Sequence, residues 1–147
     1  MEGYRNILCA TDFSDHCRVA AERAADLARR YGARLTLLHV VEHFPVDRSN
    51  VDIAPEDIDP ADYHRDKARS ALADLAKHLR FAEARQEVRF CTQSAQHEIL
   101  RHAKEHKTDL VVIASHGRHG ITSILGSTTY GLTHKSPCDV MAIRAVE

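Results

Sequence analysis

Two apolar runs constrain the fold of this 147-residue chain more than any other feature. Arg34–Val41 reads RLTLLHVV and Asp109–Ala114 reads DLVVIA, and neither shows a clear alternation of apolar with polar residues. A strand that faces solvent on one side shows that alternation, so we expect both runs to be covered on both faces. Strands of this kind are typical of parallel sheets flanked by helices. The chain is therefore expected to be an α/β protein.

Strand-like and helix-like segments alternate along the whole sequence. Three further strands are expected at about residues 5–10, 86–91 and 138–143. The segments between strands carry apolar residues at three- and four-residue steps, which indicates helices with one buried face. No repeat, low-complexity tract or linker interrupts the pattern. It predicts one domain over residues 1–147, a doubly wound five-stranded parallel sheet with helices on both faces.

Local signals predict where the helices begin and end. Short polar side chains accept hydrogen bonds from the free N–H groups of a first turn, and glycine permits the left-handed stop. A capping residue followed by proline is a further start signal. The expected positions are Ser14 or Asp12 and Gly32 for the first helix, Asp59–Pro60 for the second after a long polar loop, Ser94 for the third, and about Ser127–His134 for the fourth.

Composition excludes several classes of partner and location. The formal net charge of −1 gives no electrostatic reason to expect a nucleic acid or an anionic membrane as a partner. No segment approaches the roughly 20 apolar residues needed to cross a bilayer, and the amino terminus does not resemble a signal peptide. The cysteines are widely spaced and form no C-x-x-C pair. The simplest interpretation is a cytoplasmic protein whose cysteines are reduced. The four cysteines are Cys9, Cys17, Cys91 and Cys138.

The loop from Ser115 to Ser127 is the favoured ligand site, because it directly follows the clearest buried strand. Its glycines allow the backbone to approach a ligand closely. The alternative is that these glycines only form turns. They are Gly117, Gly120 and Gly126.

The end of this loop suits a phosphate group. Ser127 and Thr128 lie where a helix is expected to begin, and the free N–H groups of a helix start bind anions. Arg118 can add a charge-assisted contact to the same oxygens. The alternative is that Ser127 only caps the helix. No G-x-x-x-x-G-K-[ST] motif is present, so P-loop NTPase chemistry is not supported.

The ends of the other strands complete the candidate site. In doubly wound sheets, ligands bind outside the carboxyl ends of the strands where the strand order reverses. Here those segments are Ala10–Asp12, Val40–Val41 and Ser115–Gly120. Asp12 can hydrogen-bond a ribose or a base amino group, although capping of the first helix is an equally simple role.

Taken in order, these motifs resemble the universal stress protein family. The matching segments are RNILCATDFS, LTLLHVVE, DLVVIASHGRHG, ILGSTTYGLTH and SPCDVMAIR, and the weakest stretch is about 44–61. The resemblance implies a Rossmann-like, adenine nucleotide alpha hydrolase-like sheet with strand order 3-2-1-4-5. It also implies a homodimer formed through the last strand. Some members bind ATP through a glycine loop, and others, closer to the founding member, lack that loop and hold no nucleotide.

The resemblance also implies roles for particular residues. Asp12 matches the acidic residue near the nucleotide, Val40 or Val41 matches the backbone that meets adenine, and Gly117, Gly126 and Ser127 match the loop. The resulting set of candidate contacts for ATP or another adenine nucleotide is Ala10, Thr11, Asp12, Val40, Val41, Ala114, Ser115, Gly117, Arg118, Gly120, Gly126, Ser127 and Thr128. No metal is expected beyond Mg²⁺ carried by the nucleotide.

Two departures from the family pattern bear on the ligand. Ala114 occupies the position of the first glycine, which is harmless where the backbone has an ordinary strand conformation. The segment between Gly117 and Gly126 is one residue shorter than the pattern, which changes how the loop reaches the phosphates. Gly120 gives the shortened loop freedom to compensate.

Histidines are the remaining candidates for chemistry. His102 and His106 lie four apart on a helix, the spacing of a two-histidine metal site, but no third ligand is evident and a solvated helix face is the favoured interpretation. His116 and His119 can touch a phosphate or act as acid–base groups, although structural or merely exposed histidines are the favoured interpretation. His39 is expected to be a satisfied buried histidine.

Three functions follow from the sequence. The first is a stress-response protein that binds an adenine nucleotide and modulates a partner or its own assembly. The second is a nucleotide-free dimer that acts through protein contacts. The third is slow nucleotide hydrolysis assisted by His116 or His119, although no nucleophile, base and orienting group can be assembled and the sequence does not indicate an enzyme.

Overall fold

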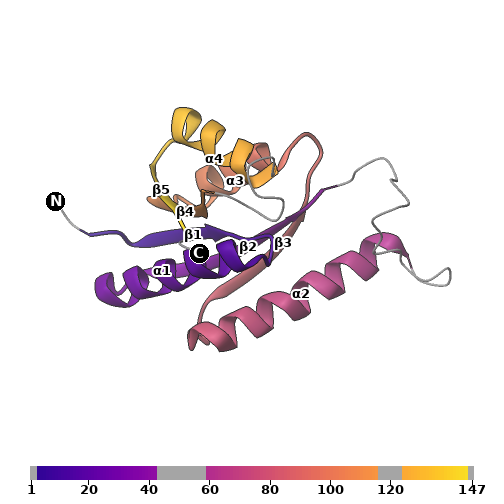
Figure 1. Cartoon of the computed structure of the whole chain (residues 1–147), viewed down its shortest axis with the longest axis horizontal. Helices are drawn as coiled ribbons and strands as arrows, with labels where there is room; N and C mark the ends of the chain where they lie inside the picture. Colours follow the sequence, from indigo (N-terminus) through magenta and orange to yellow (C-terminus); the bar gives the residue numbers. More distant parts are fainter. Residues whose placement is uncertain (1–2, 43–58, 116–123, 146–147) are drawn as a thin grey trace.

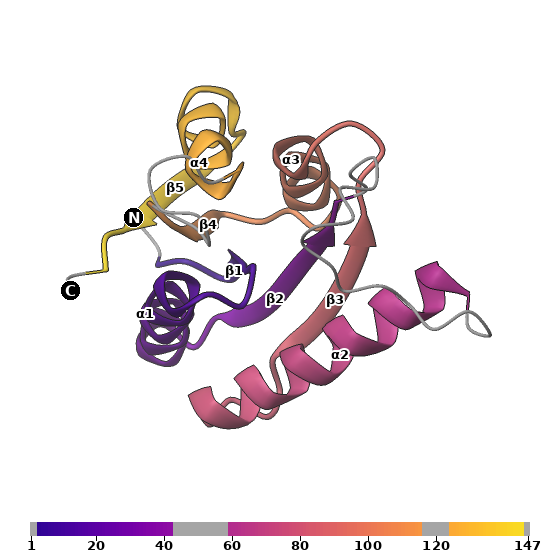
Figure 2. The ribbon, with the colours of Figure 1, turned by 45° about the vertical axis from the view of Figure 1, so that its right-hand side comes forward.

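The computed structural model describes residues 3–42, 59–115 and 124–145. Five parallel strands form one sheet in the order β3-β2-β1-β4-β5, an order visible in Figure 2. The predicted fold class and strand order are therefore confirmed. In chain order the elements are β1 (Asn6–Ala10), α1 (Asp15–Tyr31), β2 (Arg34–Val41), α2 (Pro60–Leu79), β3 (Arg85–Phe90), α3 (Ala95–Glu105), β4 (Leu110–Ala114), α4 (Ile124–Lys135) and β5 (Asp139–Ile143).

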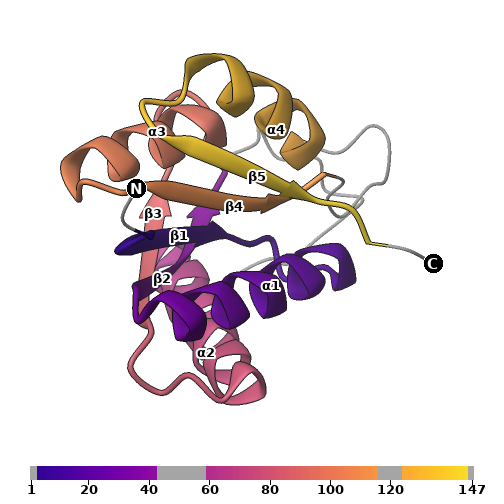
Figure 3. The same ribbon diagram turned by 90° about the vertical axis from the view of Figure 1, so that its left-hand side faces the viewer.

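Two helices cover each face of the sheet. Helices α1 and α2 lie on one side and α3 and α4 on the other, as Figures 1 and 3 show. Successive side chains of a strand point to opposite faces, so neighbouring residues enter different cores. In β2, Leu37 packs with α1 and α2, whereas Leu38 packs with α3 and α4, and both are fully buried.

The α1 stripe is made almost entirely of alanine. Five alanines of this helix are buried against the sheet, together with Cys17. Alanine has the highest helix propensity and its small side chain allows the helix to approach the strands closely. The buried alanines are Ala20, Ala21, Ala24, Ala25 and Ala28.

The predicted helix starts and stops are largely confirmed. Ser14 caps α1 and accepts a hydrogen bond from the Cys17 N–H, and Gly32 ends that helix in the left-handed conformation with φ 65°. Asp59 caps α2 with Pro60 at the first helical position. Ser94 caps α3 by accepting from the His97 N–H.

The predicted start of α4 is wrong by about one turn. The helix begins at Ile124, so Ser127 and Thr128 lie inside it and not at its first residue. Serine and threonine favour caps but are tolerated within helices, so a serine after a glycine does not fix a boundary. The N–H groups of the first turn, which have no acceptor within the helix, are then those of Ile124, Leu125 and Gly126.

None of the helices in the described part of the chain is long and apolar enough to span a membrane.

Candidate functional site

The carboxyl end of β1 lies at the point where the strand order reverses, between β2 and β4. Ala10 is the last residue of β1, and Thr11 is also buried. The Thr11 N–H donates to the Leu38 carbonyl (2.9 Å), which extends the pairing with β2 by one residue. Ligands of doubly wound sheets bind at such reversals. The fold therefore brings Ala10 and Thr11 to the edge that the sequence predicted.

The turn between β1 and α1 is held by its own side chains. The Thr11 hydroxyl accepts from the Phe13 N–H (3.0 Å), and the Asp12 carboxylate accepts from the Ser14 N–H (2.9 Å). Asp12 thus supports the start of α1, as the capping interpretation expected, while remaining at the carboxyl edge of the sheet. Binding and capping are compatible, because a carboxylate has several acceptor positions.

Phe13 adopts an unusual backbone conformation in this turn, with φ 66°. Bulky residues pay roughly 1–2 kcal/mol for the left-handed region, so the surroundings must hold the residue there. Its ring packs against His39 at 4.6 Å between centroids. His39 in turn bonds the Thr11 carbonyl through Nδ1 (2.8 Å). His39 is therefore a satisfied structural histidine, as predicted, although it is half-buried.

The end of β2 contributes apolar surface and one carboxyl group. Val40 packs on the α3/α4 side of the sheet. The Val41 carbonyl accepts from the Cys91 N–H (3.0 Å), so this backbone group serves the sheet. Glu42 follows directly and is half-buried, and its burial raises the pKa of the carboxyl above the ordinary value. Sequence reasoning missed Glu42, although its place after a buried strand was the available signal.

The end of β4 supplies the second half of the edge. Ala114 is fully buried and pairs with Ile143 of β5, within a regular strand. The Ser115 N–H donates to the Ile143 carbonyl (2.8 Å), whereas its hydroxyl is buried and has no hydrogen-bond partner among residues 3–42, 59–115 and 124–145. A buried hydroxyl without a partner is costly, which makes it a candidate for contact with a bound molecule.

The remaining predicted residues lie in the loop and in α4. Gly117, Arg118 and Gly120 fall outside the described residues, as do His116 and His119. The backbone of the other three predicted residues lies in the first two turns of α4; they are Gly126, Ser127 and Thr128. Helix α4 leads away from this edge toward β5.

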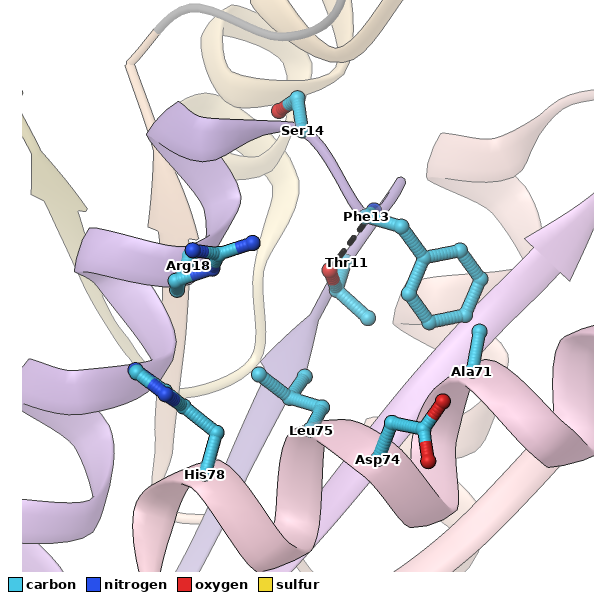
Figure 4. A pocket seen from close by; sticks show the side chains of 8 residues that line it. All are labelled: Thr11, Phe13, Ser14, Arg18, Ala71, Asp74, Leu75 and His78. Carbon is cyan, nitrogen blue, oxygen red and sulfur yellow. Dashed lines mark hydrogen bonds between the residues drawn. The ribbon is translucent and has the colours of Figure 1, made fainter.

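A cavity of about 280 Å³ opens beside this edge on the α1/α2 side. Figure 4 shows Thr11 and Phe13 entering it from the β1–α1 turn, opposite side chains of α2. Its volume is near the lower end of small-molecule clefts. The lining residues are Thr11, Phe13, Ser14, Arg18, Ala71, Asp74, Leu75 and His78.

The histidines of α3 differ from their predicted setting. His102 is 1% exposed and not part of a solvated face, whereas His106 is exposed as expected. The reason is that α3 packs against β2, and Glu87 of the neighbouring strand β3 points to the same side of the sheet and bonds His102 Nε2. The sequence around His102 and His106 offered no third metal ligand. In the structure Glu87 of β3 supplies one.

The sequence matches the model of the universal stress protein family over residues 3–144. The chain belongs to the universal stress protein family. Universal stress protein A homolog 2 of Coxiella burnetii is 33% identical over 145 residues, covering 98% of this chain and 97% of that protein. The solved structure of the universal stress protein UspA from Lactobacillus plantarum has a TM-score of 0.73 at 27% identity, covering 97% of this chain and 99% of that one.

Two further universal stress protein structures of this fold are complexes with adenine nucleotides. One, in complex with cAMP, has a TM-score of 0.68 at 22% identity and covers 96% of this chain and 97% of that one. The other, from Archaeoglobus fulgidus in complex with dAMP, has a TM-score of 0.60 at 21% identity and covers 97% of this chain and 99% of that one. At these identities the likeness establishes the shared fold.

Proposed function

We propose that this universal stress protein binds an adenine nucleotide, ATP in the first instance, across the carboxyl ends of β1, β2 and β4. The observation that carries the proposal is the buried Ser115 hydroxyl beside the strand-order reversal, which has no hydrogen-bond partner in the part of the chain that the structure describes. A ligand oxygen would satisfy it. The cAMP and dAMP complexes of proteins with this fold support the chemical class of the ligand.

Named groups of this edge have suitable chemistry for the parts of a nucleotide. The Asp12 carboxylate suits ribose hydroxyls, and Thr11 and Ser115 add neutral groups on the two central strands. The free N–H groups of the first turn of α4 suit phosphate. Ala114 sits in regular strand conformation, so its methyl group in place of a glycine introduces no backbone strain.

The biological role proposed for this binding is regulatory. Nucleotide occupancy would bias contacts with a protein partner or the assembly of the chain itself, in the cytoplasm. Mg²⁺ would arrive with the nucleotide. The expected assembly is a homodimer paired through β5, since an edge strand has unpaired backbone groups and readily adds another strand. Sizing at micromolar concentration tests this, and a monomer with and without ATP would contradict it.

ATP binding is tested by acid extraction of the purified protein and by calorimetric titration with ATP. A bound nucleotide raises the melting temperature by mass action. Asp12→Asn keeps an oxygen that can accept from the Ser14 N–H but removes the charge, and we expect ATP affinity to fall roughly 3- to 10-fold, the value of one good hydrogen bond. Asp15→Asn is the matched control, because Asp15 is exposed in the same first turn of α1.

Two results would contradict the proposed binding. One is the absence of nucleotide in the extract together with no thermal shift in ATP, which would favour the nucleotide-free dimer. The other is an equal loss of affinity in Asp12→Asn and Asp15→Asn. Steady phosphate release from ATP would agree with binding but would replace the regulatory role with the hydrolase interpretation.

A further inference from the structure

A compact cluster of metal-ligating side chains lies between β3 and α3, away from the nucleotide edge. One ligand atom each from Glu87, His102 and His106 lies within 4.8 Å of the other two. Helix α3 leads from the carboxyl end of β3 to the amino end of β4, so its last turns lie toward the amino ends of the strands. Figure 3 shows this end of α3 joining β4 opposite the arrowheads. The cluster is therefore separate from the site proposed above.

The backbone fixes the three side chains on a common side. His102 and His106 are one helical turn apart, and their rings stack at 4.3 Å between centroids with an angle of 29°. In β3, Val88 packs toward α2, so its neighbour Glu87 points toward α3. The arrangement depends on regular elements and not on a loop, which keeps the ligands in register.

The hydrogen bonding of the buried His102 ring is incomplete within the described residues. It is 1% exposed, its Nε2 bonds Glu87 Oε2, and its Nδ1 is buried without a hydrogen-bond partner. A histidine kept only as a buried structural residue would usually satisfy both nitrogens. The one hydrogen bond that this ring makes is directed at another potential metal ligand.

We propose that Glu87, His102 and His106 form a binding site for Zn²⁺ between β3 and α3. Two imidazoles and one carboxylate are a ligand set that zinc accepts, with the fourth position open to water. Ligand atoms around a tetrahedral zinc are separated by about 3.4 Å, so small rotations of the exposed His106 and of Glu87 close the cluster. Zinc would take the place of the hydrogen bond between His102 Nε2 and Glu87, and the single proton of a neutral His102 ring would shift to Nδ1 without being released.

The charge around the cluster is compatible with a cation. Glu87 brings a carboxylate to the cluster, and the two imidazoles carry no negative charge of their own. Two cations of β3 lie nearby. Arg85 contacts Glu87 Oε1 (2.7 Å), which leaves Oε2 on the side of His102, and Arg89 is held by Glu105 (2.7 Å), which offsets its repulsion.

The test uses the untagged full-length chain, stripped of metal with a chelator. Zn²⁺ is titrated in competition with a chromophoric chelator, and Co²⁺ is titrated by its visible absorption, which reports coordination geometry. We expect one ion per chain and a rise in melting temperature with Zn²⁺. Loss of an outer-shell partner costs 10- to 100-fold in metal affinity, so His106→Gln should weaken Zn²⁺ binding on the order of 10-fold or more.

The matched control is His97→Gln, because His97 is also exposed on α3 but faces away from the cluster. It should bind Zn²⁺ as the unaltered chain does. Glu87→Gln can still hydrogen-bond His102 and should weaken Zn²⁺ binding as His106→Gln does. It replaces His106→Gln in the test if circular dichroism shows His106→Gln to be misfolded. The proposal is overturned by no zinc binding at micromolar concentration, by unchanged affinity in His106→Gln or Glu87→Gln, or by an equal loss in His97→Gln.

Discussion

Among the described residues, the α1/α2 side of the sheet buries apolar side chains and the small hydroxyl of Thr11, whereas under α3 the other side buries the ionisable Glu98 and His102. The first side relies on a close-packed layer of alanine and leucine. The second places ionisable groups in a layer that must supply each of them with a partner. The difference separates two tasks, since apolar burial stabilises the fold and buried polar groups cost stability unless they are satisfied.

The largest expected effect on the free energy of unfolding comes from truncating adjacent leucines of β2, one in each of the two cores. Leu37→Ala should lower the free energy of unfolding by about 4 kcal/mol and Leu38→Ala by about 3 kcal/mol, because the smaller α3/α4 core can relax more around the cavity. Urea unfolding monitored by circular dichroism measures both values. A larger loss for Leu38→Ala would mean that the polar side is the more rigidly packed one.

A smaller effect is expected from breaking the ion pairs of the polar side. Arg89 lies 3.8 Å from Glu98, whose side chain is 3% exposed. Arg89→Ala should cost about 2 kcal/mol, less than a fully buried pair, because Arg89 is partly exposed and Arg101 remains near Glu98.

Two further variants sharpen this result. Adding Glu98→Leu to Arg89→Ala should restore most of the stability, because the buried charge is then gone. Arg101→Ala should change stability by less than roughly 0.5 kcal/mol, since its side chain is 56% exposed. Equal losses in Arg89→Ala and Arg101→Ala would show that burial of Glu98 does not govern the energetics here.

The smallest effect concerns the thiols, whose protonation differs between buried and partly exposed positions. Burial raises the pKa of Cys17 to about 12 and that of Cys9 still further, and both belong to the apolar side. At pH 8 a thiol reagent should modify Cys91 and Cys138 in the native protein, while Cys9 and Cys17 react on the order of 10³-fold more slowly.

The same shift predicts how stability depends on pH. The folded pKa of Cys17 lies above its ordinary value of 9.0. The stability that the buried, protonated Cys17 thiol contributes is therefore fully present below pH 9 and is lost as the pH rises toward about 12. Cys17→Ala should flatten that decline. Rapid modification of all four thiols without denaturant would contradict the buried state of Cys9 and Cys17.

The fold was predictable from the sequence because its signals are local. The run at Arg34–Val41 and the caps at Ser14, Asp59 and Ser94 depend on neighbours within a few residues. The strand order came from the family resemblance, since no local signal says which strands are adjacent.

The site was predictable only in part, for the opposite reason. Strand ends such as Thr11 and Ser115 could be located because parallel strands share one edge. The burial of His102 could not be predicted, because it depends on how α3 packs on the sheet and on Glu87 of β3, which is fifteen residues away in the chain. The start of α4 was misplaced because serine and threonine, although they favour caps, also occur inside helices, so Ser127 alone could not mark the first residue.

The two borders of the sheet carry different chemistry. In β3, at one border, Arg85, Glu87 and Arg89 alternate with other residues, and charges of this kind discourage a foreign strand from pairing. In β5, at the other, half-buried Val140 and Met141 occupy the centre of the strand. In the proposed homodimer, the β5 edge of each copy would be covered by a symmetric contact. Such an assembly would close as a pair and would not continue into a fibre.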